Sequence, residues 1–361
     1  MEKVNMKNLG LTDRLIQDSQ QYKNLYIGRI SSQFTNLYKV ITEKGEMTAQ
    51  ISGKFRHSVS DLSEYPAVGD FVMVDRIDNT QGDGIIHQVL TRKSTFARKV
   101  AGRKTDTQVV AANIDTLFIC MSLNNDFNLR RLERYISVAW DSGAVPVIVL
   151  TKSDLCSDLE EKRKEVESIA IGIEIIITSS ISEDGFEELK KYLSDGKTVA
   201  FIGSSGVGKS TLTNHLLGES IIETSGIRND DKGRHTTTRR ELFMIPNLGV
   251  VIDTPGMKEL GIIHADLSKS FADIEELAAQ CKFNDCTHNK EPKCAVQNAI
   301  QEGTLSPERL ESFRKLKKET KYDGLNSKRI EKEKLNDMFS GVGDMKNARK
   351  FIKEKNKKKI R

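Results

Sequence analysis

Long apolar runs and cysteines are both scarce in this chain. No apolar run among the 361 residues reaches the roughly 18–20 that a membrane-spanning helix needs. The five cysteines are odd in number and no signal peptide pattern precedes them, so a secreted disulfide framework is not expected. Repeats and low-complexity segments are also lacking before the basic C-terminal end. We therefore expect a multidomain, monomeric protein of the cytoplasm with reduced cysteines and no membrane partner.

One glycine-rich segment carries the strongest signal, because it matches the phosphate-loop pattern G-x-x-x-x-G-K-[ST] in full. It follows an apolar stretch at 198–202 that predicts a strand, and it precedes a segment at 211–217 that predicts a helix. Strand, loop and helix are the context in which backbone N–H groups and a helix N-terminus bind phosphate. The alternative is a glycine-rich turn without a ligand. The residues expected to bind nucleotide here are Gly203, Ser204, Ser205, Gly206, Val207, Gly208, Lys209, Ser210 and Thr211.

Lys209 is expected to reach the β- and γ-phosphates, and the Ser210 hydroxyl to bind Mg²⁺. About 40 residues later an apolar stretch at 250–253 ends in Asp253, followed by Thr-Pro-Gly256. Asp253 is placed to hold the Mg²⁺ shell, and the Gly256 N–H is placed to meet a γ-phosphate. Taken alone, Thr-Pro-Gly would be an ordinary turn.

A base-recognition motif lies upstream of the phosphate loop. An apolar, mostly β-branched run at 145–150 predicts a buried strand, and a second strand is predicted at 173–178. In guanine-nucleotide proteins an Asn/Thr-Lys-x-Asp tetrad reads the base, because its Asp accepts hydrogen bonds from guanine N1 and N2. Adenine has no such donor pair and would leave the carboxylate unpaired. A helix N-cap is the alternative for the tetrad alone. The residues expected at the base are Thr151, Lys152, Ser153, Asp154, Ser179 and Ser180.

The order of these motifs is unusual, since base recognition precedes phosphate binding. In ordinary small GTPases the phosphate loop comes first, so this order predicts a circularly permuted GTPase domain. The core tolerates such permutation because chain ends usually lie close together at the surface. The switch segments then fall near the end of the domain, and the segment that follows is directly tethered to them.

After the GTPase motifs, a span of fourteen residues contains four side chains of the types that bind metal ions. Their types and spacing predict a structural zinc site with a closed ligand set. The alternatives are chance clustering of free thiols or a redox pair, and the remaining Cys120 and Cys156 are scattered and expected to be inert. The predicted zinc ligands are Cys281, Cys286, His288 and Cys294.

These motifs together resemble one family, the ribosome small subunit-dependent GTPase A (RsgA/YjeQ) family, from about residue 24 to about residue 315. The resemblance implies an N-terminal OB-fold β-barrel, a central α/β circularly permuted P-loop GTPase domain and a mostly α C-terminal zinc-binding domain. It also implies a role in late maturation of the small (30S) ribosomal subunit, with rRNA, GTP and GDP as partners and with hydrolysis stimulated by the subunit. The matching segments are 151–154, 203–210, 233–238 and 253–256, with the Cys281, Cys286, His288 and Cys294 set.

The N-terminal region supports the barrel independently. Five short strands are predicted there at 25–30, 37–41, 47–51, 70–75 and 84–90. Such barrels often bind oligonucleotides, and the alternative is a barrel that only packs against its neighbour. The expected divisions are a lead-in at 1–23, the OB-fold at 24–95, the GTPase domain at 96–265, the zinc-binding domain at 266–315 and a basic helical or disordered extension at 316–361.

Two basic stretches could contact RNA. The segment 92–104 carries six cations, for which a solvated linker is the alternative. Residues 301–361 carry 19 Lys and Arg against 10 Asp and Glu, although the whole chain is only +5. The tail 353–361 is expected to be disordered when free and suited to rRNA phosphates, with a solvated tail as the alternative.

Three departures from common GTPase sequences bear on catalysis. The residue after Gly256 is Met257, which cannot orient water as a Gln does in Ras-like enzymes. Thr151 replaces the usual Asn and is shorter, so it is expected to tie the loops less firmly. Gly206 stands where potassium-using GTPases have Asn. Lys209, Gly256 and, in the switch segment 226–240, His235 are the catalytic candidates; an rRNA contact is the alternative role for His235. Thr237 is a further candidate Mg²⁺ ligand.

The function that these features favour is a Mg²⁺-dependent GTPase that acts as an assembly factor or checkpoint on the small ribosomal subunit. One alternative is a nucleic-acid-binding module that uses nucleotide only as a structural ligand. Another is an ATP-using RNA-remodelling enzyme, against which Asp154 argues.

Overall fold

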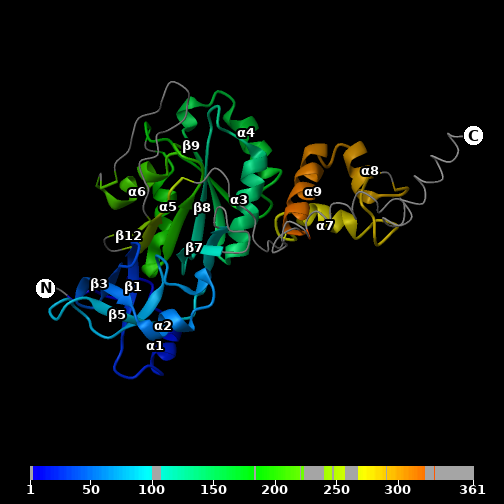
Figure 1. Ribbon diagram of the computed structural model, residues 1–361. Coiled ribbons are helices and arrows are strands. Elements are labelled where there is room, and N and C mark those ends of the chain that lie inside the picture. The colour runs from blue at the N-terminus through cyan, green and yellow to red at the C-terminus, as the bar shows by residue number, and fades with distance from the viewer. Residues whose placement is uncertain are drawn as a thin grey trace, which may run out of the picture.

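The computed structural model describes residues 3–99, 107–182, 184–219, 221–222, 240–245, 248–256, 267–289, 291–321 and 329. It has three parts: a small barrel, a larger α/β part above it, and a helical part to one side (Figure 1). His235, Thr237, Met257 and the basic tail 353–361 lie outside the described residues.

The strands form one large sheet and one two-stranded ribbon. The large sheet has the order β10-β9-β8-β11-β13-β12-β1-β2-β3-β5-β4, and β6 pairs with β7 in the ribbon. The strands are β1 Tyr26–Gln33, β2 Tyr38–Thr42, β3 Gly45–Ile51, β4 Phe71–Val74, β5 Gly84–Val89, β6 Thr95–Lys99, β7 Thr107–Ala112, β8 Thr116–Ser122, β9 Val145–Thr151, β10 Glu174–Ile177, β11 Thr198–Ile202, β12 Glu241–Met244 and β13 Val250–Asp253.

Helices connect and cover these strands. The α-helices are α1 Asp13–Ser19, α2 Gly53–Ser58, α3 Leu129–Ser142, α4 Leu159–Glu167, α5 Phe186–Lys190, α6 Lys209–Leu217, α7 Ala272–Ala278, α8 Ala295–Gln301 and α9 Pro307–Lys321. Short 3₁₀ turns occupy Leu62–Glu64, Ser153–Leu155 and Lys191–Gly196. No helix in the described ranges is long and apolar enough to cross a membrane.

The N-terminal barrel contains the five strands predicted from the sequence. Strand β1 pairs with both β2 and β4, β3 pairs in parallel with β5, and β5 pairs with β4, so the sheet closes. The interior side chains of Ile30, Val40, Val72 and Ile86 are fully buried. They pack in one cluster with residues two positions along the same or neighbouring strands, such as Tyr38 and Val74, and so share the inward face. The closed five-stranded barrel confirms the predicted OB-type architecture.

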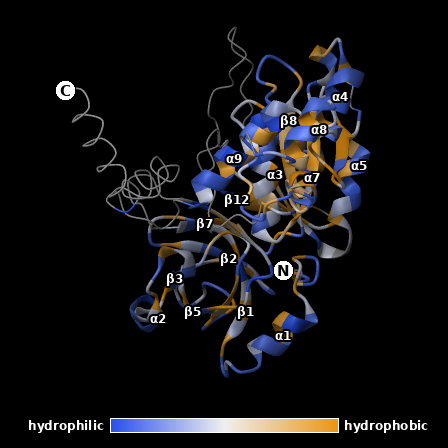
Figure 2. Cartoon of the chain, turned by 90° about the vertical axis from the view of Figure 1, so that its right-hand side faces the viewer, coloured by the Kyte–Doolittle hydropathy of each residue, from blue (hydrophilic) through white to orange (hydrophobic). Residues whose placement is uncertain are grey.

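The central part is an α/β sandwich built on the parallel strands β10, β9, β8, β11 and β13. Helices α3 and α4 cover one face of this sheet, and α5 and α6 cover the other (Figure 1). The strands read as continuous apolar runs because both faces are buried. Figure 2 shows the strands around β8 in the hydrophobic colour and much of α4 in the hydrophilic colour.

One strand joins the barrel to the α/β part. Glu241 at the start of β12 pairs with Ser32 of β1 on one side and with Asp253 of β13 on the other. The buried Arg29 of the barrel also donates a 2.9 Å hydrogen bond to the Thr198 hydroxyl at the start of β11. The two parts are therefore hydrogen bonded into a single sheet.

Residues 92–99, the described part of the basic segment 92–104, do not form a solvated linker, which is the alternative given for this segment. Its first cation, Arg92, forms a 2.7 Å ion pair with fully buried Asp70 and donates to the carbonyl oxygens of Ser63 and Tyr65. The segment then forms β6, which pairs with β7. Arg92 thus stabilises the barrel and its charge is already compensated.

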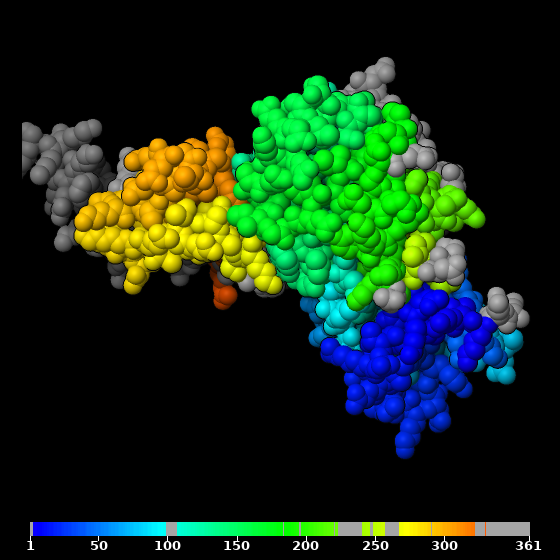
Figure 3. Space-filling view, turned by 180° about the vertical axis from the view of Figure 1, so that it is seen from behind, coloured from blue at the N-terminus to red at the C-terminus, as the bar shows by residue number. Residues whose placement is uncertain are grey.

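The C-terminal module consists of α7, α8 and α9, and it contacts the α/β part through α3 (Figure 3). Arg309 of α9 lies 3.0 Å from Glu133 of α3, and it also forms a paired contact of 2.6 and 2.8 Å with Asp273 of α7. Arg309 and Glu133 are 3% and 1% exposed. Charges this deeply buried require such pairing, so Arg309 fastens the module to α3.

Candidate functional site

The phosphate loop lies between β11 and α6, as the sequence predicted. Gly203, Gly206 and Gly208 have φ values of +152°, +77° and +104°, which glycine tolerates best. A Cβ atom on Gly203 would lie 2.6 Å from the carbonyl oxygen of Cys120 on β8. The loop therefore curls closely over the ends of the strands, and glycine is required where it touches β8.

Lys209 points back into this loop. Its ammonium donates to the carbonyl oxygens of Gly203 at 3.1 Å and Ser204 at 2.9 Å. The side chain is 6% exposed, and burial lowers its pKa, while the nearby charge of Asp253 opposes that shift. The cation is thus held against the backbone of the loop, where phosphate oxygens would bind.

Asp126, which the sequence analysis did not single out, is hydrogen bonded to the phosphate loop. The Ser204 hydroxyl donates a 2.6 Å hydrogen bond to Asp126, in the connection between β8 and α3. Arg131 of α3 in turn binds Asp126 at 2.9 Å. The signal that could have revealed Asp126 is its place just after the apolar run 116–121, which ends beside the loop.

The strand β13 brings the second predicted motif to the same place. Asp253 is its last residue and is 1% exposed, and the Thr254 hydroxyl donates a 2.5 Å hydrogen bond to the carbonyl oxygen of Phe201. A Cβ atom on Gly256 would lie 2.7 Å from Cα of Ser205. The backbone of Gly256 therefore rests directly on the phosphate loop, and only glycine fits there.

The predicted base-recognition residues meet at the ends of β9 and β10. The Ser179 hydroxyl donates a 2.7 Å hydrogen bond to Asp154, which leaves the Asp154 side chain exposed but oriented. The Thr151 hydroxyl donates a 2.6 Å hydrogen bond to the carbonyl oxygen of Val207 in the phosphate loop. Lys152, in the turn between Thr151 and Asp154, has a left-handed φ of +60°. Ser153 begins the following 3₁₀ turn, and Ser180 is exposed.

Topology explains why these distant segments converge. Strands β8, β9, β10, β11 and β13 are parallel, so their carboxyl ends share one edge of the sheet. Ligands of open α/β sheets bind at that edge. The arrangement places the residues predicted for the base, the phosphates and Mg²⁺ along one continuous edge. Ser210 and Thr211, the second and third residues of α6, follow Lys209 there.

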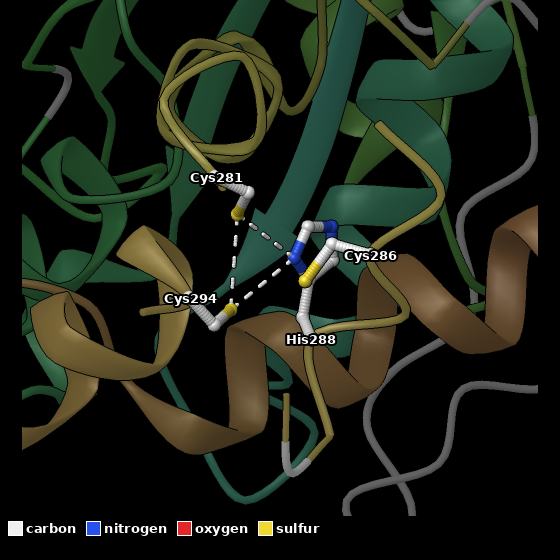
Figure 4. A group of neighbouring side chains, drawn as sticks. All are labelled: Cys281, Cys286, His288 and Cys294. Carbon is white, nitrogen blue, oxygen red and sulfur yellow. Dashed lines mark hydrogen bonds between the residues drawn. The ribbon is translucent and has the colours of Figure 1, made fainter. Parts of the chain in front are cut away.

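A second site lies in the C-terminal module, where the four predicted ligands come together (Figure 4). The Sγ atoms of Cys281 and Cys294 are 3.8 Å apart, and each is 3.5 Å from Nδ1 of His288. With Cys286, all four ligand atoms lie within 4.8 Å of one another. Cys281 follows α7 and Cys294 caps α8. The cluster could therefore hold one metal ion, and the structure brings together all four residues that the sequence analysis named.

The loop that carries His288 is held by α8 and α9. Arg314 of α9 donates to the carbonyl oxygens of Thr287 at 3.2 Å and His288 at 2.6 Å. Gln297 of α8 donates to the same His288 oxygen. His288 itself has a left-handed φ of +59°. These contacts fix the direction of the imidazole toward the cysteines.

Comparisons with known proteins show which proteins this chain is similar to. The family described as RsgA GTPase matches residues 89–263, and the family described as ABC transporter matches residues 186–341, a range that includes the phosphate loop. The small ribosomal subunit biogenesis GTPase RsgA 2 of Lactiplantibacillus plantarum is 49% identical over 347 residues, covering 96% of this chain and 98% of that protein. Its namesake from Listeria monocytogenes is 45% identical over 298 residues, covering 82% and 84%.

Two solved structures are also similar. The crystal structure of YjeQ from Thermotoga maritima has a TM-score of 0.60 and 29% identity, covering 84% of this chain and 100% of that one. The structure of YloQ, titled a circularly permuted GTPase, has a TM-score of 0.58 and 25% identity, covering 84% and 98%.

Proposed function

This chain belongs to the RsgA GTPase family, and from that premise we propose that it acts in late maturation of the small (30S) ribosomal subunit in the cytoplasm. It binds the rRNA of that subunit, and the subunit stimulates its hydrolysis of GTP to GDP and phosphate. The observation that carries the proposal is the joining of a base-recognition motif to a phosphate loop on one sheet edge, in a chain 49% identical to a small ribosomal subunit biogenesis GTPase.

Guanine selection rests on Asp154. Its carboxylate is oriented by Ser179 and remains exposed at the sheet edge. Guanine presents two donors, N1–H and N2–H, to such a carboxylate, whereas adenine presents none in that position. A site built for a donor pair rejects the ligand that lacks it, because the carboxylate would lose its partners.

Phosphate binding rests on Lys209 and the loop around it. The ammonium now bonds to the carbonyl oxygens of Gly203 and Ser204, and a bound triphosphate would offer it stronger, charged acceptors. The backbone of Gly256 lies against Ser205, and its N–H would suit a γ-phosphate oxygen. Ser210 and the buried Asp253 supply oxygen ligands of the kind that Mg²⁺ prefers, and Mg²⁺ would neutralise phosphate charge. Thr237 is a further candidate ligand.

The catalytic site needs help from a partner. Met257 follows Gly256 and has no group that can orient water. His235, in the switch segment 226–240, could do so once the subunit fixes that segment. Partners that complete a GTPase site in this way accelerate hydrolysis by roughly 10³–10⁵-fold.

The Cys₃His cluster is assigned to one structural zinc ion. A tetrahedral zinc with Zn–S of about 2.3 Å and Zn–N of about 2.0–2.1 Å requires S···S separations of about 3.8 Å and S···N separations of about 3.6 Å. The observed separations match these values: 3.8 Å between the Sγ atoms of Cys281 and Cys294, and 3.5 Å from each Sγ to Nδ1 of His288. The match supports zinc, and four protein ligands leave no open position for catalysis.

Nucleotide state and subunit binding are linked through the C-terminal module. In this scheme GTP holds the switches, and with them the tethered module, in the arrangement that binds the subunit, and hydrolysis releases them. The chain order supports the link, because the module directly follows the switches.

The experiment is GTP turnover measured alone and with purified small subunits, large subunits or free RNA. Small subunits are expected to accelerate turnover, and large subunits are not. Equal turnover under all conditions would instead favour a nucleic-acid-binding module that uses nucleotide structurally. A His235→Ala variant separates chemistry from binding: full stimulation in that variant would remove His235 from the reaction.

A further inference from the structure

A cavity of about 440 Å³ opens between the barrel and the β6–β7 ribbon, well apart from the nucleotide edge. Its aromatic side chains are Tyr38 and Tyr65, and the amides of Gln33, Asn36 and Gln108 also line it. Tyr38 is 5% exposed and its hydroxyl is bonded to the Gln33 side chain. The cavity therefore combines flat apolar surface with neutral donors and acceptors.

Among the described residues no carboxylate lines this cavity, and the one charged lining residue is Arg56. Asp70, whose charge acts on Tyr38, is fully buried and engaged with Arg92. The cavity thus suits a ligand with an aromatic ring, hydrogen-bonding edges and a negative charge.

Two further arginines lie at its edge. Arg98 of β6 contacts the cavity residue Gln108 at 3.4 Å, and its Nε is buried without a hydrogen-bond partner. Ser32 of β1 pairs with Glu241 of β12, so the preceding residue, Arg240, lies opposite Gln33. Gln33 also pairs with Tyr38 of β2. Paired residues of antiparallel strands share a face of the sheet, so Arg240 lies on the same face as Gln33 and Tyr38. Burial, and then the charge of Arg98, lower the pKa of Arg240 to about 10.

Among the described residues, no carboxylate is paired with either of these arginines. Within the described ranges no ion pair joins Arg98 or Arg240 to a carboxylate. Two half-buried guanidinium groups that repel each other raise the free energy of the fold unless an anion compensates them. A phosphate is the anion whose geometry arginine matches best.

We propose that this cavity binds one unpaired nucleotide of RNA, with the base against Tyr65 and the phosphate at Arg98 and Arg240. Protein sites for single-stranded RNA combine these elements: aromatic stacking, amides for the base edge and cations for the backbone. The inference rests on the proposed function, since it specifies where stimulating RNA would bind.

The position of Arg240 gives the nucleotide a route to the catalytic edge. Arg240 directly precedes β12, and the first residue of β12, Glu241, pairs with Asp253. A phosphate that binds Arg240 therefore fixes the end of the switch segment one strand away from the predicted Mg²⁺ ligand. RNA in the cavity is expected to stimulate hydrolysis through this strand.

The first experiment locates the RNA. A hexauridylate with one 4-thiouridine is photo-crosslinked to the full chain, and the attached peptide is identified by mass spectrometry. Crosslinks at Tyr38 or Tyr65 support the proposal. Crosslinks only elsewhere, or none, overturn it. Displacement of the hexamer by UMP at equal concentration would assign the cavity to a free nucleotide and overturn the RNA assignment.

The second experiment uses variants. Tyr65→Leu removes the ring and should weaken hexamer binding about 5-fold or more, whereas Tyr65→Phe keeps the ring and should bind as the parent does. Arg98→Gln and Arg240→Gln should each reduce the slope of log Kd against log salt by about 0.7. Lys54→Gln, an exposed charge change on α2 outside the cavity, is the matched control and should leave both quantities unchanged.

The outcomes separate this inference from the proposed function. The ratio of turnover with small subunits to turnover without them is measured for each variant. If the parent chain is not stimulated at all, the proposed function fails. If the parent is stimulated and Tyr65→Leu and Arg240→Gln are stimulated equally, the cavity is not the RNA site although the function stands.

Discussion

The hydroxyl of Thr151 donates a 2.6 Å hydrogen bond to the carbonyl oxygen of Val207, 56 residues further along the chain. This bond ties the end of β9, where the base is recognised, to the loop that holds the phosphates. We expected the short Thr side chain to tie these loops less firmly than Asn would. The bond is present and its donor is 4% exposed, so water does not compete with it.

Replacing Thr151 should weaken guanine nucleotide binding. Thr151→Val keeps the shape but leaves the buried Val207 carbonyl oxygen without this donor, and one such bond contributes about 0.5–1.5 kcal/mol. The affinity for GDP, measured by titration calorimetry, should fall about 2- to 12-fold. Thr151→Ser keeps the hydroxyl and serves as control; an unchanged affinity in the Val variant would show that the bond does not hold the site together.

Asp154→Asn should change the base that is preferred. An amide offers a donor where the carboxylate offered only acceptors, so guanine loses a hydrogen bond while xanthine, with a carbonyl oxygen at that position, gains one. Competition between GDP and XDP for the site should therefore reverse its order in the variant. Wild-type chain that binds ATP as tightly as GTP would contradict the whole assignment.

Lys209→Ala and Ser210→Ala should abolish GTP turnover. The first removes the charge on the β- and γ-phosphates, and the second removes a Mg²⁺ ligand. Phosphate release under saturating GTP and Mg²⁺ is the measurement, with Lys190→Ala, an exposed change on α5, as control. Normal turnover by Ser210→Ala would show that Mg²⁺ is held elsewhere.

One zinc ion should copurify with each chain. Cys281→Ser or Cys294→Ser should lose it and unfold mainly the C-terminal module, because binding energy at a structural zinc site is folding energy. Elemental analysis and hydrogen exchange over α7 to α9 test this, and Cys156→Ser, outside the cluster, should retain the metal. A zinc-free chain with a folded module would refute the site.

Arg309→Ala should loosen the C-terminal module from α3. It leaves Asp273 without this cation and Glu133 with Arg130 alone, and breaking a buried pair by removing one partner costs up to about 3–5 kcal/mol. Hydrogen exchange of the α9 backbone should accelerate accordingly. The double change Arg309→Met with Asp273→Leu removes the carboxylate that loses this cation, while Glu133 keeps Arg130, and should recover much of the loss. If Arg309→Ala alone changes nothing, the module is held by its apolar contacts.

The sequence predicted those features that local pattern determines. Apolar runs bounded by turn residues gave the five barrel strands and the strands that end at Thr151 and Asp253, and spacing gave the four ligands around His288. Contacts between distant segments had no such signal. The bond from Ser204 to Asp126 spans 78 residues, and the pairing of Arg92 with Asp70 turns a basic stretch into barrel structure. Both depend on which strands become neighbours, which composition does not reveal.

The closure of β4 onto β1 has a consequence for self-association. Because β4 pairs with β1, the barrel end of the large sheet has no strand with unpaired backbone N–H and C=O groups along one side. Within the described ranges, the large sheet therefore ends in a free edge only at β10. Exposed edges are templates for pairing between molecules. Here the edge is four residues long and begins with Glu174, whose carboxylate accepts a 2.6 Å hydrogen bond from Tyr192. A charge at the start of this short, isoleucine-rich edge opposes strand-to-strand aggregation there.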